Sequence, residues 1–243
     1  MAQATARSLA GLTNDLTDAE LLELTNNGNR PELKKFLAAL ATTRSDGTFV
    51  THLSDDEARA RFPQFAEAVA LWRKYATAMS YTGPVAWRIK EGFTLKTHAP
   101  KAGPCFDQLN YLKGWSLKND EPTKNALVFW VPRIAEGSSG KTADEMMTLQ
   151  AELRKQYKLP KNHCSSFGSI ALNFALILAH FKRTGERMPL KYFYAASDTF
   201  HEVGYRLFAG DFHEYGLDCS YWAGRYGSGI VGCFLLGVET LGN

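Results

Sequence analysis

The stretch DCSYWAGRYGSG, residues 218–229, lies in a C-terminal tail whose composition differs from that of the rest of the chain. Residues 192–243 contain six of the ten tyrosines, interleaved with glycines, and no lysine. The tail has a formal charge of −4, from two arginines and six carboxylates, in a chain whose total is +3. Tyrosine interleaved with glycine is typical of short twisted strands and turns. The sequence therefore predicts a β-rich tail.

Two helices are predicted immediately before the tail. Thr142 and Glu145 form a capping box that opens a helix over 142–157. A second, more apolar helix is predicted over 165–184, beginning at Cys164 or Ser165. Its expected core residues are Ile170, Leu172, Phe174, Leu176, Ile177 and Leu178. Before both helices, the apolar run 126–134 favours a buried strand.

The N-terminal part of the chain is helical in pattern. Capping boxes at Thr17 with Glu20 and at Ser54 with Glu57 precede amphipathic runs. Residues 80–121 carry glycine, proline and tryptophan without helical spacing, which indicates short strands and loops. We therefore predict a helical N-terminal extension over 1–79 and one α+β domain over 80–243.

Composition excludes several classes of protein. With 45% hydrophobic and 22% charged residues, the 243-residue chain is not disordered, collagen-like or a coiled coil as a whole. The small net charge, with basic residues spread between acidic ones, argues against a nucleic-acid partner. The longest apolar run, 170–181, is too short and too interrupted to insert in a membrane. No secretory signal is recognisable, so we expect a cytoplasmic protein or one exported by a route other than Sec.

The four cysteines have neither metal-ligand spacing nor a disulfide framework. We expect reduced, mostly buried thiols and neither a metal nor a cofactor. Sugar binding through calcium is disfavoured, because the chain lacks the Glu-Pro-Asn and Trp-Asn-Asp triplets that supply converging oxygen ligands in calcium-dependent lectins. The oligomeric state is left open by the sequence.

Five segments in succession resemble a known family. They are SFGSIALNFALILAHFKRTGERMPL (166–190), YFYAASDT (192–199), YRLFAGDF (205–212), GLDCSYW (216–222) and VGCFLLGVE (231–239). Together, over roughly 142–239, they resemble the C-terminal half of variable proteins from diversity-generating retroelements. The resemblance implies a C-type lectin fold of the formylglycine-generating-enzyme-like branch, with two helices on small antiparallel sheets and long loops. Cys219 and Cys233 lie too far apart in sequence to match the reactive cysteine pair of the enzymes in that branch.

The resemblance also implies a function and a set of binding positions. In that family, error-prone copying at adenines turns AAC codons into many residue types but never into Lys, Glu, Gln, Met or Trp. This implies a variable region of about 192–232 in which Trp222 and Glu214 are fixed. The candidate ligand-binding positions are Phe212, His213, Tyr215, Asp218, Ser220, Tyr221, Ala223, Arg225, Tyr226, Ser228 and Ile230. The expected protein performs no chemistry and binds a protein or cell-surface ligand.

Two other interpretations stay open at this point. The Tyr/Ser/Gly-rich stretch 218–229 has the composition of an antibody paratope, but an ordinary glycine-rich loop has it too. A cysteine enzyme is the alternative of a different class, because Cys164 is expected at a helix N-terminus, where the helix dipole lowers a thiol pKa. His201 and Asp218 follow in the order found in transglutaminase-like enzymes.

Overall fold

The computed structural model describes residues 49–243, except 118–120, 189–191, 203 and 243. The chain divides into two compact units, Met1–Thr48 and Phe49–Asn243. The helices predicted before residue 48 therefore lie outside the described residues. The second unit contains, in chain order, β1 (Val50–Leu53), α4 (Asp55–Arg61), η1 (Pro63–Phe65), α5 (Ala66–Ala78), β2 (Ala86–Ile89), α6 (Leu95–Ala102), η2 (Phe106–Gly114), β3 (Ala126–Trp130), α7 (Ala143–Gln156), α8 (Ile170–Thr184), β4 (Tyr194–Glu202), β5 (Tyr205–His213), β6 (Gly216–Ala223), β7 (Val231–Gly232) and β8 (Leu236–Thr240).

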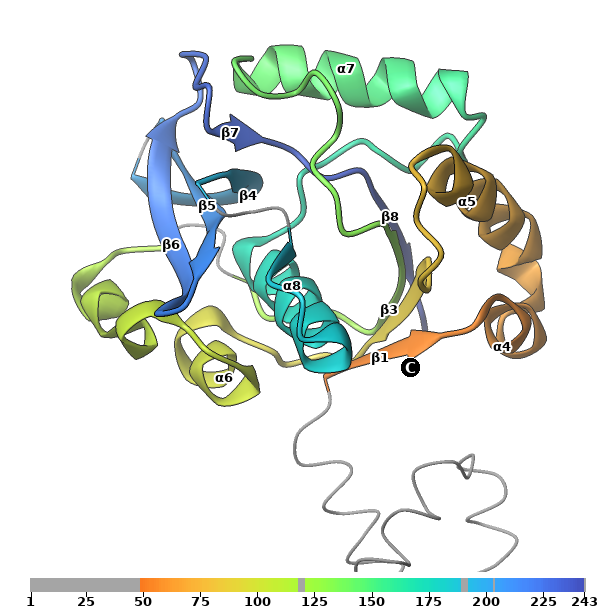
Figure 1. Cartoon of the computed structure of the whole chain (residues 1–243), viewed down its shortest axis with the longest axis horizontal. Helices are drawn as coiled ribbons and strands as arrows, with labels where there is room; N and C mark the ends of the chain where they lie inside the picture. Colours follow the sequence, from red (N-terminus) through yellow and green to blue (C-terminus); the bar gives the residue numbers. More distant parts are fainter. Residues whose placement is uncertain (1–48, 118–120, 189–191, 203, 243) are drawn as a thin grey trace, which may run out of the picture. The chain divides into compact units, whose positions relative to one another are not determined.

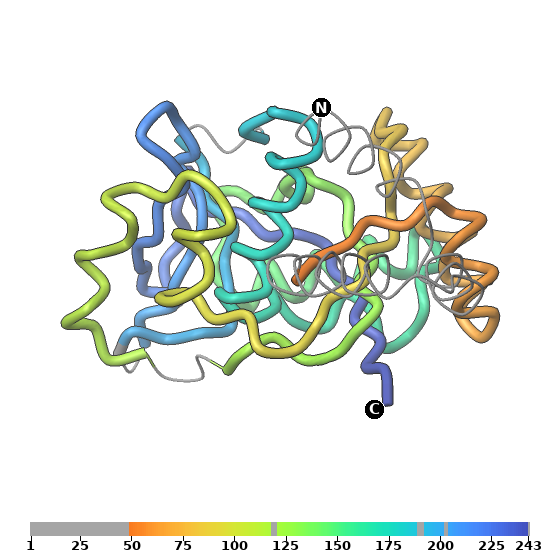
Figure 2. Tube along the Cα trace, turned by 90° about the horizontal axis from the view of Figure 1, so that it is seen from below, coloured from red at the N-terminus to blue at the C-terminus, as the bar shows by residue number. Residues whose placement is uncertain are grey.

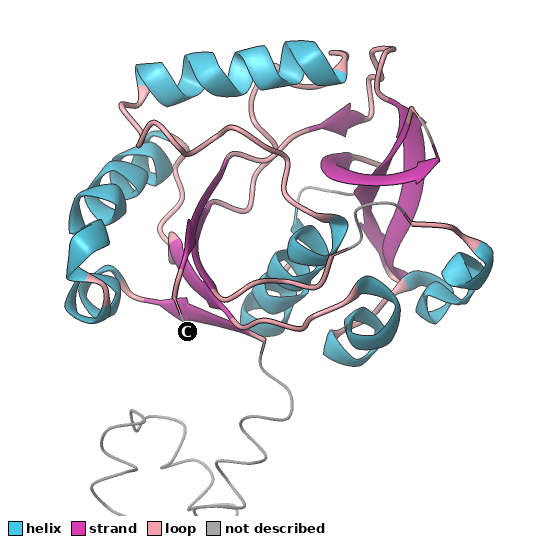
Figure 3. Cartoon of the chain, turned by 180° about the vertical axis from the view of Figure 1, so that it is seen from behind, coloured by secondary structure: helices cyan, strands magenta, loops and turns pink. Residues whose placement is uncertain are grey.

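The strands form two small sheets (Figures 1 and 3). The first is antiparallel with the order β1-β2-β3-β8, so that the last strand of the chain pairs with the strand that precedes both long helices. The second has the order β6-β5-β4-β7, with antiparallel hairpins from β4 to β6 and β7 parallel to β4. The protein is therefore of the mixed α+β class with small sheets, as predicted.

The apolar helix α8 lies between the two sheets (Figure 1). Five of its six predicted core residues are buried and Leu172 is half-buried. The same core cluster holds Trp87 and Trp130 of the first sheet and Leu207 and Cys219 of the second. Burial of such side chains contributes about 1.5–3 kcal/mol each. Asn173 on α8 is also buried, where its amide donates to the carbonyl oxygens of Phe167 and Ala196.

Helix α8 begins later than predicted. Ser169 is its N-cap, with Oγ accepting from the backbone N–H of Leu172 at 3.1 Å, and Gly185 ends it in the left-handed conformation. Cys164 lies in the loop before the helix with φ 53°, so the prediction of a helix start at 164 or 165 was wrong. The physical reason is that Gly168, at φ +72°, turns the chain before the helix can form. The capping box of α7 at Thr142 and Glu145 is confirmed.

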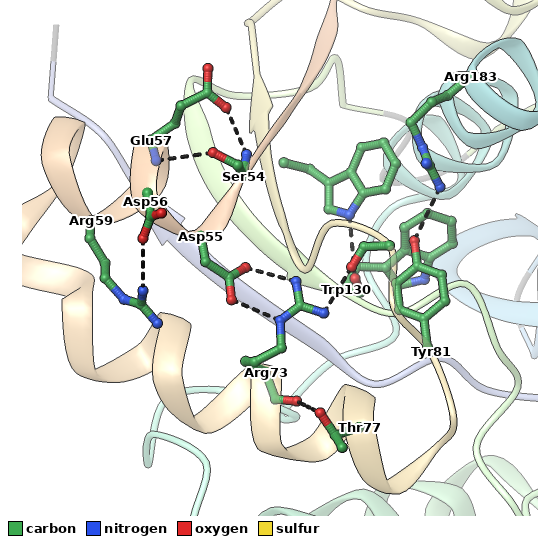
Figure 4. Close-up of polar contacts among 12 residues, drawn as sticks. Ser54, Asp55, Asp56, Glu57, Arg59, Arg73, Thr77, Tyr81, Trp130 and Arg183 are labelled. Carbon is green, nitrogen blue, oxygen red and sulfur yellow. Dashed lines mark hydrogen bonds and ion pairs between the residues drawn. The ribbon is translucent and has the colours of Figure 1, made fainter.

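The predicted domain boundary between residues 79 and 80 was also wrong. Strand β1 is part of the first sheet, and the unit that contains it begins at Phe49. The Ser54–Glu57 capping box does open α4, and Arg73 of α5 makes two 2.7 Å contacts with the Asp55 carboxylate (Figure 4). Trp72 of α5 is fully buried and stacks on Phe129 of β3. These helices cannot be an extension, because their apolar face forms part of the core.

All four cysteines are buried, as predicted. Within the described part of the chain, none of the helices is both long enough and apolar enough to cross a bilayer.

Candidate ligand-binding face

Eight aromatic rings form one continuous band of ring contacts. Along the band they are Tyr215, His213, Phe106, Tyr111, Trp115, His201, Tyr221 and Tyr205, and we call this set the aromatic band. Neighbouring ring centroids lie between 4.6 Å, for Trp115 stacked on His201, and 6.2 Å, for Phe106 against His213. Each of the eight side chains is exposed or half-buried.

The second sheet places the tail members of the band. Leu207 pairs with Tyr221 and Tyr205 pairs with Ala223, so that Tyr205 and Tyr221 are diagonal neighbours on one face. Their centroids are 5.5 Å apart at an interplanar angle of 89°. Edge-to-face pairs of this kind fix the orientation of exposed rings.

The remaining members come from η2 and from the residue that follows it, and η2 runs beside the edge strand β6 (Figure 2). Three consecutive residues of η2, 107–109, have positive φ angles of 44°, 49° and 58° and kink the segment. Leu109 and Leu112 are buried beneath it, whereas Phe106, Tyr111 and the following Trp115 remain at the surface or half-buried.

Tyr111 fastens η2 to β6. Its hydroxyl donates to Oδ1 of Asp218 at 2.5 Å, and the backbone N–H of Cys219 donates to the hydroxyl at 3.0 Å. Unpaired N–H groups at a sheet edge otherwise invite association with another strand. Burial, together with the bond to Asp218, raises the pKa of Tyr111. The tyrosine thus stays neutral and keeps its donor proton.

Asp218 is an anchor for this arrangement. Burial raises the pKa of its carboxyl group, and the hydrogen bond from Tyr111 counteracts that rise. Burial, together with the nearby carboxylates of Asp218 and Asp211, raises the pKa of Tyr194 on β4. The Asp218 side chain therefore joins β6 to η2 and lies near Tyr194.

A hollow of about 270 Å³ adjoins the Tyr205 end of the band, where the β4–β5 hairpin meets the N-terminus of α7. Its lining residues are Ala143, Asp144, Phe200, Gly204, Tyr205, Arg206, Ala223, Gly224 and Arg225. The guanidinium of Arg206 makes cation–π contacts with two rings, at 4.6 Å from the Phe200 centroid and 5.4 Å from the Phe167 centroid. Arg225 lies 5.0 Å from the centroid of Tyr226 on the loop that follows β6.

The predicted binding positions differ in exposure. Tyr215 (70%), Tyr226 (60%), Ile230 (49%) and Tyr221 (45%) have large exposed fractions, and Arg225 is exposed as well. His213, Asp218, Ser220, Ala223 and Ser228 are half-buried. The band brings together His213, Tyr215 and Tyr221, and the hollow brings together Ala223 and Arg225.

Phe212 was wrongly predicted as a displayed position. Only 1% of it is exposed, and its ring packs against Phe181 of α8 with centroids 5.1 Å apart. Strand β5 has its register shift between Gly210 and His213, and Phe212 within this irregular stretch enters the core. Neighbouring Trp222, in contrast, is buried as expected, and its Nε1 donates to the Tyr226 carbonyl at 2.7 Å.

The residues of the cysteine-enzyme interpretation are not arranged for catalysis. Burial raises the pKa of Cys164 to about 12, and the residue is not at a helix N-terminus. Its side chain packs in the core cluster that contains Tyr75 and Cys233, whereas His201 stacks on Trp115 and Asp218 accepts from Tyr111. A thiol nucleophile needs a lowered pKa and an adjacent base, and Cys164 has the opposite environment.

Sequence reasoning missed the part of the face that comes from η2 and the start of β5. Phe106, Tyr111 and Trp115 lie in the span predicted as loops and short strands, and the aromatic spacing FDQLNYLKGW was the signal available. Tyr205 and Arg206 were not among the predicted positions either.

Among the described residues, no group of three or more His, Cys, Asp or Glu side chains could hold a metal ion. Comparison of the chain with protein-family models, curated proteins and solved structures returns no match.

Proposed function

We propose that this protein binds a protein or cell-surface ligand through the aromatic band and the adjoining loop 224–230, and that it is a display protein of the C-type-lectin-like kind diversified by a retroelement. The observation that carries the proposal is the band itself, eight contacting rings at a surface that the fold leaves open. Ten large hydrophobic side chains are exposed among the described residues. Seven of them lie in the tail between Tyr192 and Ile230, and an eighth is Phe106 of the band.

Exposed aromatic rings suit a binding face for an energetic reason. Tyrosine and tryptophan present large amphipathic surfaces and lose little conformational entropy when a ligand binds. Such residues dominate interface hot spots, where truncation costs about 2 kcal/mol or more. In the aromatic band the rings already restrain one another, which lowers the entropy loss further.

The order of elements supports a lectin-like scaffold. A buried strand, β3, is followed by α7 and α8, then by the antiparallel β4–β6, and the last strand returns to pair with β3. Leu207 and Cys219, which lie on the same face of the sheet as Tyr205 and Tyr221, belong to the core around α8. Exposed positions on β6 and the following loop can therefore change while the core keeps its packing.

For the binding test, a peptide ligand is first selected from a displayed library with the wild-type protein. The affinities of two triple variants for this peptide are then compared with that of the wild type. Replacing Trp115, Tyr205 and Tyr221 with alanine should weaken binding by at least 30-fold, because about 2 kcal/mol corresponds to that ratio. The matched control replaces Met147, Lys158 and Val238, which lie outside the face, and should leave affinity unchanged. Equal affinity of the folded band variant and the control would refute the proposed face.

The retroelement part of the proposal has a genetic test. The gene should have codons ending in C at most of the exposed binding positions, and a near-copy of the segment nearby should carry AAC at the same places. A reverse-transcriptase gene should lie in the neighbourhood. A locus without both the repeat and the polymerase would reduce the proposal to a ligand-binding protein that is not diversified.

A further inference from the structure

Arg206 lies at the hollow with part of its guanidinium unused. Its Nη1 donates to the carbonyl of Ser197 at 3.3 Å and to Oδ1 of Asp198 at 3.2 Å. Among the residues that the structure describes, neither Nε nor Nη2 of Arg206 has an acceptor, and neither is sealed from solvent. These two N–H groups form one edge of the planar guanidinium, the edge that matches a carboxylate with two parallel hydrogen bonds.

The surroundings hold this edge in place. Phe200 and Phe167 flank the guanidinium, and Asp198 fixes its far side, so that Arg206 has little rotational freedom left to lose. Gly224 keeps the near side open, because a Cβ there would lie 3.4 Å from Cδ and 3.5 Å from Nε of Arg206. A preorganised donor pair beside a hollow binds more strongly than a flexible surface arginine.

We propose that the hollow is a carboxylate-binding subsite, which takes an acidic side chain of a protein ligand on the Nε–Nη2 edge of Arg206. This inference rests on the proposed function, since it names the group that the ligand places beside the aromatic band. Tyr205 and Phe200 supply walls for the methylene groups of the acidic side chain. Arg225 at the rim adds positive charge, and Asp144 opposes it. The selectivity for a carboxylate therefore comes from the two-donor edge and not from the net charge of the hollow.

The test uses the full chain and two small probes that differ by one group. N-acetyl-glutamate α-amide carries the carboxylate, and N-acetyl-glutamine α-amide is its neutral match. Titration of each is followed by the NMR signal of the Arg206 Nε–H group. We expect a saturable shift with the acid and at least 10-fold weaker binding of the neutral probe. Equal responses to the two probes would overturn the proposal.

Three variants locate the binding. Arg206→Lys keeps the charge but removes the two-donor edge, and Gly224→Val leaves Arg206 in place and fills the entrance. Each should weaken binding of the acid at least 10-fold, measured by the Tyr205 ring signals. Lys182→Gln removes a positive charge from an exposed position of α8 outside the hollow, so it is the control and should change affinity less than 3-fold. If Arg206→Lys and Gly224→Val bind as well as the wild type, the subsite does not exist.

The two proposals fail separately. The probe titration needs no protein ligand, so its failure removes the subsite and leaves the aromatic band as the binding face. Conversely, a band variant that keeps full affinity for the selected ligand removes the proposed function, while the acid probe would still report on Arg206.

Discussion

The carboxylate of Asp218 on β6 lies close enough to Tyr194 of β4 to add to the rise that burial causes in the pKa of the phenol, although β5 lies between their strands. The register aligns Tyr194 with Gly210 and Gly210 with Asp218, so that the phenol passes over the one position without a side chain. Asp218 also accepts from Tyr111, so this single carboxylate joins η2 to β6 beside Tyr194.

Gly210 should therefore tolerate no side chain. In Gly210→Ala the new Cβ would lie 2.1 Å from the carbonyl oxygen of Phe193 and 2.5 Å from Cα of Tyr194, both backbone atoms. We expect a loss of about 1–3 kcal/mol in the free energy of unfolding, the usual cost of overpacking, measured by urea denaturation. Gly229→Ala, where a Cβ would meet nothing within 4 Å, is the control and should change stability by about 0.5 kcal/mol or less. Equal stability of the two variants would show that the close approach of the β4 backbone to Gly210 does not exclude a side chain there.

Truncation of two aromatic residues, Trp222 on β6 and Tyr226 on the loop that follows it, should change the free energy of unfolding by very different amounts. Trp222→Ala should lose about 3–5 kcal/mol, because the indole is buried and bonded to the Tyr226 carbonyl. Tyr226→Ala removes an exposed ring and should cost about 0.5 kcal/mol. Thermal unfolding of both variants measures the difference, and a large loss in Tyr226→Ala would place that ring in the core.

The stability of the protein should fall as the pH drops below about 6.5, the unfolded pKa of histidine. Burial lowers the pKa of His163, whose Nδ1 accepts from Trp72 Nε1 at 2.9 Å and whose Nε2 lies 2.9 Å from the Glu239 carboxylate. Below pH 6.5 the unfolded chain binds a proton that the folded histidine does not take up, so the free energy of unfolding falls by up to about 1.4 kcal/mol per pH unit until the folded pKa is reached.

His163→Gln tests this source of pH dependence. Glutamine can accept from Trp72 and donate towards Glu239 but does not titrate. Urea denaturation between pH 7.5 and 5.5 should give a smaller slope for the variant than for the wild type. Part of the slope should remain, because burial also lowers the pKa values of His180 and His52. An unchanged slope would show that His163 does not contribute, and NMR titration of the wild-type imidazole gives the same answer if the variant does not fold.

All the thiols should react slowly in the folded protein. Burial raises the pKa of Cys105, Cys164 and Cys233 to about 12, and all four side chains are buried. Iodoacetamide at pH 7.5 should label the native protein far more slowly than the urea-unfolded protein, with mass spectrometry identifying the sites. Rapid labelling of Cys164 alone would revive the cysteine-enzyme interpretation.

Local signals in the sequence were sufficient for α4, for α7 and for the character of the tail. They were not sufficient for α6 and η2, which lie in a span predicted to hold short strands and loops. Thr142 with Glu145 defines the start of α7 because a capping box involves only neighbouring residues. The alternation along β6 likewise predicts that Trp222 points inward. The start of α8 could not be obtained in this way, since the turn at Gly168 competes with helix formation before Ser169. Phe212 was wrongly predicted to be displayed, because the register shift that turns it into the core depends on the pairing of β5 with β6.

The sequence by itself determined an α+β protein with two long helices and a tyrosine-rich, β-structured tail. Only the tertiary structure decided that residues 49–79 belong to the same unit, because β1 needs β2 as its partner in the sheet. Only the tertiary structure, too, assembled the aromatic band, where Tyr111 and Asp218 meet across 107 positions of sequence. Such contacts depend on how η2 packs along the edge of β6, and no short-range pattern encodes that packing.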